Sequence, residues 1–195
     1  MLPSREQLLE ILNAPDCLTI VLRGQQAVER ALDAAISEAL PEPHALEVEK
    51  LSFALKADLA VALRVIRTDS RGALLALYRI RNRFAHRIDA AFEQKEAEDF
   101  GNALSGWQRH LLGREPSGYA EPRDLLRNAV AVLFVECTSA QRRLQEAKLA
   151  DEVLHEIAQE TLAGSTVRDE NAHLTDVHQE MRERLAAKKA ERGLP

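Results

Sequence analysis

Apolar side chains recur every third or fourth residue along most of the chain, and this spacing is typical of helices that pack side by side. Residues 16–40 show it clearly, with Ile20, Gly24, Val28 and Leu32 each four positions apart. Such residues share one face of an α-helix, whereas a half-buried strand alternates with a period of two. No alternating segment stands out, and aromatic residues, which favour strands, make up only 4% of the chain. The sequence therefore predicts an all-α fold.

Capping residues and a loop divide this pattern into five to six helices. Ser4 and Gln7 have the form of a capping box, and Asp16 can cap the helix that Pro41 ends. Glycine and proline gather in the loop at residues 113–122. The expected helices span approximately residues 4–13, 16–40, 46–66, 71–86, 93–112 and 124–148.

The composition changes after the last of these helices. We expect residues 1–148 to form the helical bundle and residues 149–195 to form a charged helical C-terminal extension. Residues 166–195 contain six basic and six acidic side chains but only six large apolar ones. Val167, Leu174 and Met181 are spaced by seven, which is the spacing of a coiled-coil seam. Because this seam is so short, we favour a solvated helix that frays or packs against a neighbour.

Charge and cysteine content exclude several classes of protein. The net charge of −5 argues against binding nucleic acid or an anionic membrane over the whole surface. Cys17 and Cys137 are too few for a disulfide framework or a cysteine-based zinc site. The N-terminal sequence has no pattern of a secretory signal, and no apolar run approaches the roughly 18 residues of a membrane span. We therefore expect a cytoplasmic protein that does not bind a membrane.

Arginine is concentrated in one segment of this acidic chain. Residues 64–87 contain seven arginines and one acidic residue, a local charge of +6. A guanidinium group donates two parallel hydrogen bonds to a phosphate, so the cluster predicts a local anion site. Arg81 interrupts an apolar stripe that contains Leu77, Phe84 and Ile88. We expect its side chain to meet an acidic partner, a cleft or a subunit interface, because a buried arginine without a partner is costly.

The segment Arg81–His86 resembles the R-N-x-x-x-H signature of the HEPN superfamily, a group of helical bundles. More narrowly, the layout of the chain is similar to the mannitol operon repressor family. The resemblance covers roughly residues 16–145 and implies an HEPN-like bundle. The parts that carry it, besides the signature, are the pattern of the second helix, residues 51–66, residues 77–86 and Phe92.

Catalytic HEPN proteins are metal-independent endoribonucleases, often toxins or defence effectors, and are typically dimers with the signature at the interface. The resemblance therefore makes Arg81 and His86 the candidate catalytic pair, with Asn82 orienting them. A histidine can move a proton at the 2′-OH or the leaving oxygen, and an arginine can stabilise charge on the phosphorane. Each chain supplies one such histidine, so a homodimer would supply both an acid and a base, without a cofactor. The candidate RNA-phosphate ligands are Arg79, Arg83 and Arg87.

Arg81 and His86 are five residues apart, about 140° around an ideal helix. They reach one ligand only if the helix ends or distorts near Phe84, or if two chains meet there. Asn82 and His86 are four residues apart and can touch.

The mannitol repressor-like relatives imply a different function, that of a non-enzymatic transcriptional regulator. Such a protein acts through a protein partner and does not read DNA itself. Leu74, Leu77 and Ile80 give the arginine-rich helix an apolar face that we expect in the core, and this argues against direct sequence-specific DNA binding. If the chain is a toxin, the expected partner is an antitoxin. If it is a regulator, the expected partner is a transcription factor. A structural assembly module remains a third interpretation.

Other constellations have structural explanations. His86 and its arginines can form an ion and hydrogen-bond cluster with Asp89 or Glu93. Glu170 and His173 have the spacing found in di-iron bundles, but that site needs glutamates on two further helices, and we expect no metal. We expect Cys137 in the core, and Trp107 either in the core or at an interface.

Overall fold

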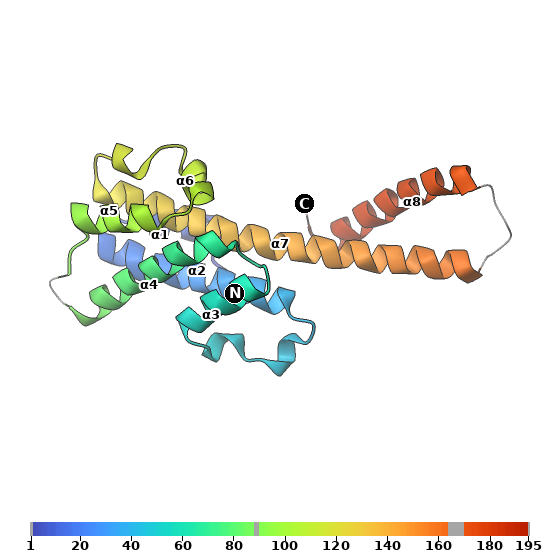
Figure 1. Ribbon diagram of the computed structural model, residues 1–195, viewed down its shortest axis with the longest axis horizontal. Helices are drawn as coiled ribbons and strands as arrows, with labels where there is room; N and C mark the ends of the chain where they lie inside the picture. Colours follow the sequence, from blue (N-terminus) through green and yellow to red (C-terminus); the bar gives the residue numbers. More distant parts are fainter. Residues whose placement is uncertain (1, 88–89, 164–169, 195) are drawn as a thin grey trace. The chain divides into compact units, whose positions relative to one another are not determined.

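The computed structural model describes residues 2–87, 90–163 and 170–194, without the side chains of residues 161–163 and 170–176. Helices account for most of this part of the chain, and it contains no strand (Figure 1). The all-α fold class is therefore confirmed. Eight α-helices and four short 3₁₀-helices occur among the described residues, so the expected number of five to six is too low.

The chain divides into two compact units, Met1–Gln141, called the bundle unit, and Arg142–Pro195, called the hairpin unit. Helix α7 (Pro122–Ala163) runs without a break through residue 148, where we expected the bundle to end. The α-helices are α1 (Arg5–Leu12), α2 (Cys17–Ala39), α3 (Phe53–Ala62), α4 (Arg71–His86), α5 (Gln94–Ala103), α6 (Gly106–Leu112), α7 (Pro122–Ala163) and α8 (Glu170–Glu191).

The expected capping residues begin the first two helices. The backbone N–H of Ser4 donates to Gln7 Oε1 at 2.9 Å, and the backbone N–H of Gln7 donates to Ser4 Oγ at 3.3 Å. Asp16 caps α2 by accepting a hydrogen bond of 2.7 Å from the backbone N–H of Thr19. The predicted bounds of α4 agree with the structure at both ends.

Two expected helices are each interrupted by a serine cap. Residues 46–66 contain the 3₁₀-helix Val48–Lys50 and then α3, which begins where Ser52 accepts a hydrogen bond from the backbone N–H of Leu55. Residues 93–112 form α5 and α6, and Ser105 caps α6 in a capping box with Gln108. A serine side chain that bonds the backbone offers the chain a helix start in place of a continuous helix.

Helix α3 ends in a Schellman motif that places an arginine in the left-handed conformation. Arg64 has φ 57°, where glycine is the usual residue. The backbone N–H of Val65 donates to Ala60 O at 2.8 Å, and that of Arg64 donates to Val61 O at 3.0 Å. Val65 is buried, so the turn directs the chain back into the core before α4 begins.

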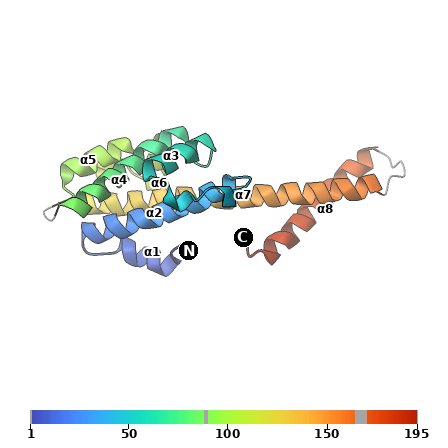
Figure 2. The same cartoon turned by 90° about the horizontal axis from the view of Figure 1, so that it is seen from below.

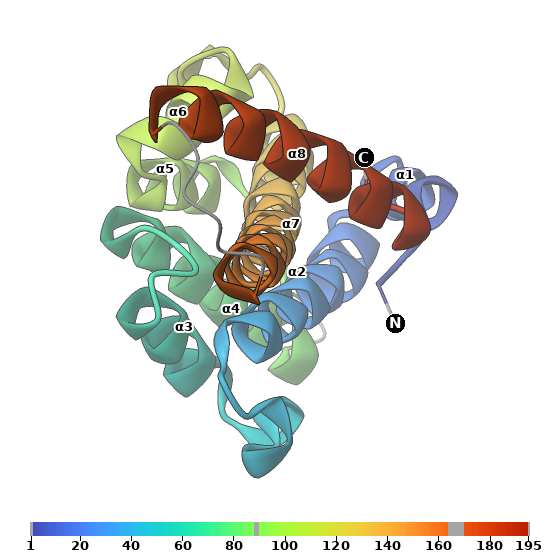
Figure 3. The same cartoon turned by 90° about the vertical axis from the view of Figure 1, so that its right-hand side faces the viewer.

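The core of the bundle unit lies between α2, α4 and the first half of α7. Helix α2 packs against α1, α3 and α4 (Figure 2). At Gly24 it also approaches α7 so closely that a Cβ atom would lie 2.8 Å from Val130 Cγ1. Figure 3, in which α7 is seen nearly end-on, shows the neighbouring helices around it. Among the fully buried core side chains are Ile20, Leu32, Ile36, Leu74, Leu77, Leu126 and Leu133.

Two polar clusters, each built around a buried polar side chain, lie next to this apolar core. Lys56 is only 1% exposed, and its Nζ lies 2.7 Å from Glu29 Oε1 and 2.9 Å from Asp33 Oδ1. Burial alone would lower the pKa of Lys56, but the hydrogen bonds that its ammonium group donates to these two carboxylates outweigh burial and raise it. Burial raises the pKa of Asp33, although Lys56 opposes this shift. Helices α2 and α3 are thus joined by an ion triad around the buried Lys56.

The second buried cluster joins three helices through the carboxylate of Glu136 on α7. Glu136 Oε1 accepts a hydrogen bond of 2.5 Å from Ser70 Oγ, directly before α4. Glu136 Oε2 accepts a hydrogen bond of 2.8 Å from Gln108 Nε2 on α6. Both donors are fully buried, and the carboxylate fixes where α4 begins relative to α6 and α7.

In the hairpin unit, α8 packs antiparallel to the second half of α7. Arg184 pairs with Glu160, Lys188 with Glu156 and Arg192, directly after α8, with Glu152, so the partners follow one another in opposite directions. Leu149, Val153 and Ile157, one turn apart on α7, are buried. No helix among the described residues is both long enough and apolar enough to span a membrane.

Candidate functional site

The signature segment occupies the C-terminal end of α4. The helix is held by a buried apolar face that includes Leu74, Leu77, Ile80 and Phe84, as the sequence predicts. This face belongs to the core, so α4 presents only its other side to a ligand. Arg83 and His86 stand in its last turn, where cations interact favourably with the helix dipole.

Arg81 and Asn82 are joined directly. Arg81 Nη1 donates to Asn82 Oδ1 at 3.2 Å, and both side chains are half-buried. Arg81 has no ion pair among the described residues, although it lies on the same stripe as the buried Leu77 and Phe84. Its charge is therefore available to an anion, and Asn82 limits where the guanidinium can point.

His86 is the last residue of α4 and is exposed to solvent. In the part of the chain that the structure describes, it makes no hydrogen bond to Arg81, Asn82 or Glu93 and no ion pair. Among the described residues no hydrogen bond joins Asn82 and His86, and the Asn82 oxygen accepts from Arg81. Asp89, the other partner considered for His86, lies outside the described residues, as does Ile88.

Arg83 contacts α5 and a residue just before it. Its Nη1 pairs with Glu96 on α5, and its Nη2 donates to the carbonyl oxygen of Ala91 at 3.1 Å. Burial alone would raise the pKa of Glu96, but backbone hydrogen bonds and Arg83 outweigh it and lower that pKa. A phosphate that binds Arg83 therefore has to compete with a carboxylate already in place.

The seven arginines of residues 64–87 fall into two groups. Three of them form ion pairs with nearby acids: Arg67 with Asp69, Arg71 with Asp58, and Arg83 with Glu96. The other four, which have no ion pair among the described residues, are Arg64, Arg79, Arg81 and Arg87. The local excess of positive charge is therefore smaller than the sequence count suggests, and it is greatest toward the end of α4.

An open cavity of about 380 Å³ lies beside α4 and α5. Arg79 and Arg83 contribute to its wall, together with Glu96, Asp99 and Phe100. Its wall thus carries two guanidinium groups and two carboxylates, of which Arg83 and Glu96 form an ion pair. The structure thus brings Arg79 and Arg83 together at one cavity and joins Arg81 to Asn82.

Sequence reasoning missed the two acids that neutralise part of the cluster. Asp58 and Arg71 are 13 residues apart, and so are Arg83 and Glu96. In each case the partners lie on two different helices, with the segment that joins those helices between them in the sequence. No helix periodicity links residues across such a segment, so the sequence contained no signal for either pair.

Groups of histidine, cysteine and carboxylate that could hold a metal ion do not occur among the described residues. The side chains of Glu170 and His173 lie outside them. Cys137 is buried, and burial raises the pKa of its thiol, which opposes a role as nucleophile. Burial likewise raises the pKa of Cys17. Trp107 is 45% exposed, so it does not belong to the core.

Comparison with protein-family models, curated proteins and solved structures finds no match to this chain.

Proposed function

We propose that the chain is an HEPN-like RNA-targeting protein that contacts RNA through the C-terminal end of α4. The observation that carries the proposal is the group of cations there without acidic partners among the described residues. Arg79, Arg81 and Arg87 belong to this group, and the exposed His86 lies among them in sequence. Such cations gain most from binding phosphate, because they lose no ion pair in doing so.

The proposed reaction is metal-independent cleavage of the RNA backbone. The 2′-hydroxyl attacks the adjacent phosphorus, its proton leaves, and the 5′-oxygen of the next nucleotide departs with a proton. His86 would transfer one of these protons, and Arg81 would stabilise the negative charge on the phosphorane. The hydrogen bond of 3.2 Å between Arg81 and Asn82 supports the role of Asn82 as a positioning residue.

The reaction needs a proton acceptor and a proton donor, and we propose that a homodimer supplies both. His86 is exposed at a helix end, so a second copy of the chain can approach it. Two copies related by twofold symmetry would bring two such histidines to one scissile phosphate. Arg79 and Arg87 would then contact phosphates on either side of it.

RNA binding tests the proposal. Fluorescence polarisation with a labelled single-stranded RNA, measured over increasing NaCl, should give an affinity that falls steeply with salt. Arg81→Ala and Arg79→Ala should each weaken binding and reduce the salt slope by about 0.7, the value for one phosphate contact to a single strand. Arg71→Ala is the matched control, because Arg71 lies on the same helix but is paired with Asp58. Equal losses in all three variants would contradict the proposed surface.

A second candidate function is that of a non-enzymatic regulator that acts through a protein partner. The observation that favours it is on α6, where Trp107 and Leu111 are 45% and 41% exposed and lie one turn apart. Exposed tryptophan is enriched at sites where proteins bind one another. This candidate would be favoured over the first if the wild type fails to bind RNA but binds a defined protein partner. The Trp107→Ala variant should then fail to bind that partner.

A further inference from the structure

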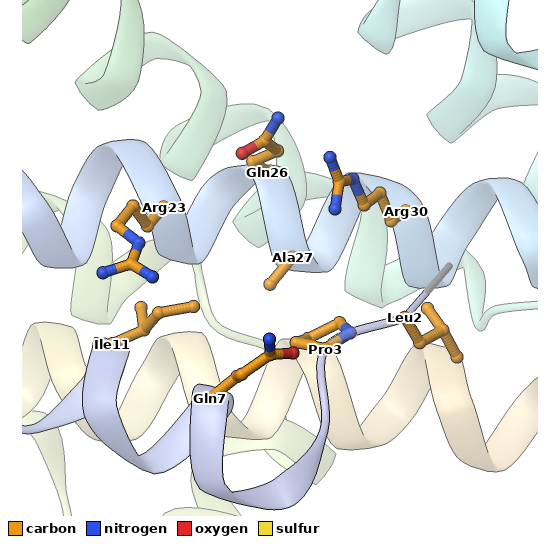
Figure 4. A pocket seen from close by; sticks show the side chains of 8 residues that line it. All are labelled: Leu2, Pro3, Gln7, Ile11, Arg23, Gln26, Ala27 and Arg30. Atoms are coloured by element: carbon orange, nitrogen blue, oxygen red, sulfur yellow. The ribbon is translucent and has the colours of Figure 1, made fainter.

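A pocket of about 260 Å³ lies between α1 and α2, away from the arginines of α4 (Figure 4). Helix α2 contributes Arg23, Gln26, Ala27 and Arg30 to it, and α1 contributes Gln7 and Ile11. The chain just before α1 closes one side. The proposed function does not use this pocket.

Its polar groups are hydrogen-bond donors or neutral amides, and none of the residues that line it is acidic. Arg30 has no ion pair among the described residues, and Arg23 has only a long one of 3.5 Å to Glu10, with both side chains well exposed. An ion pair of this kind contributes little to stability and is easily exchanged for another anion. The pocket therefore carries two positive charges that are available to a ligand.

The two arginines lie toward opposite ends of the pocket. They are seven positions apart on α2, which corresponds to a rise of roughly 10.5 Å along the helix. Gln26 lies between them, and the capping box uses Oε1 of Gln7 to bind the backbone of Ser4. This bond leaves the Gln7 amide nitrogen free to donate, and in Figure 4 that nitrogen points toward α2.

The floor between the arginines is apolar. Ile11 is 5% exposed and Ala27 is 4% exposed, and Leu2 and Pro3 form an apolar wall beside them. A single inorganic phosphate would use one guanidinium and leave this floor uncovered. A longer molecule can cover the apolar floor and place an anionic group at each arginine.

We propose that the pocket between α1 and α2 binds a small linear dicarboxylate, with one carboxylate at Arg23, the other at Arg30, and the hydrocarbon stem over Ile11 and Ala27. Two charge-assisted contacts at a fixed separation discriminate against ligands that have a single acidic group.

Isothermal titration calorimetry with adipate, at low salt, tests the site. Hexanoate is the matched ligand, because it has the same number of carbons but one carboxylate. Adipate should bind at least about tenfold more tightly than hexanoate, and Arg23→Ala or Arg30→Ala should abolish this preference. Arg5→Ala removes one charge from the exposed surface of α1 outside the pocket and should leave the preference for adipate intact.

Gln26→Glu provides a second test that leaves both arginines in place. A carboxylate between them should repel adipate, while the exposed position of Gln26 leaves the fold unchanged, as circular dichroism will verify. The proposal would be overturned if the wild type shows no preference for adipate over hexanoate. It would also be overturned if Arg5→Ala loses this preference as fully as Arg23→Ala or Arg30→Ala does. Arg81→Ala should bind adipate as tightly as the wild type does, because Arg81 does not line the pocket. Failure of adipate binding can therefore be distinguished from failure of RNA binding.

Discussion

Replacing Lys56 by methionine is expected to destabilise the bundle unit by about 3 kcal/mol, near the lower end of the range for breaking a buried ion pair. Methionine conserves most of the apolar stem, so the change isolates the loss of charge. Asp33 and Glu29, only 13% and 29% exposed, would then face each other without a cation. The expected loss lies near the lower end of that range because the carboxylate of Glu29 can still reach water. A loss of this size corresponds to a fall in Tm of roughly 6–12 °C.

The loss should depend on pH. Burial raises the pKa of Asp33 above its ordinary value even beside Lys56, and the lysine counteracts this shift. Without the lysine, the pKa of Asp33 in the folded state rises further. A carboxyl with a raised folded pKa stabilises the fold at low pH, and this contribution disappears as the pH rises through that pKa. The Lys56→Met variant should therefore lose less stability at pH 4 than at pH 8.

Urea unfolding followed by tryptophan fluorescence measures this effect in the bundle unit, since Trp107 is the one tryptophan of the chain and lies in that unit. Lys50→Met is the matched control, because the pair between Lys50 and Glu47 is about 70% exposed and should contribute less than about 1 kcal/mol. Neutralising Glu29 and Asp33 as well, with Gln and Asn, should recover part of the loss. Equal stability of Lys56→Met and Lys50→Met would refute the role of the triad.

Three further changes test other parts of the fold. Arg64→Gly should stabilise the bundle unit by up to about 1 kcal/mol in urea unfolding, because glycine adopts the left-handed conformation at φ 57° without strain; destabilisation would contradict this reading of the turn. Gly24→Val should destabilise by more than about 2 kcal/mol, since its Cβ would lie 2.8 Å from Val130 Cγ1; an unchanged midpoint would show that α2 and α7 are not in close contact. Arg184→Ala should speed amide exchange in α8, because it removes the ion pair with Glu160. In the wild type, 1 M NaCl should speed this exchange similarly by screening the pair. If neither the substitution nor the salt changes the exchange rate, the pair does not stabilise α8.

The sequence was sufficient to predict the helices whose ends are marked by local chemistry. Ser4 and Asp16 cap α1 and α2 as expected, and the stripe of Leu74, Leu77 and Ile80 in α4 is buried. The expected helices at residues 46–66 and 93–112 were wrong because apolar spacing continues across a serine cap. Whether such a serine bonds the backbone depends on tertiary packing, which a single sequence does not contain.

The candidate site was predictable only in part, for the same reason. Arg81, Asn82 and His86 are neighbours along one helix, so their location at its end followed from the predicted bounds of α4. The ion pair of Arg83 with Glu96 depends on the path of the chain between α4 and α5. The pocket between α1 and α2 likewise depends on how α1 folds back onto α2.

The most direct test of the proposed function is cleavage of a mixed RNA pool in the presence of EDTA. The wild type, Arg81→Ala, His86→Ala and the control Arg71→Ala are compared after equal helicity and oligomeric state have been verified. We predict cleavage by the wild type and Arg71→Ala, and no cleavage by Arg81→Ala or His86→Ala. An inert wild type, or equal activity in all four proteins, would contradict a ribonuclease site at the end of α4.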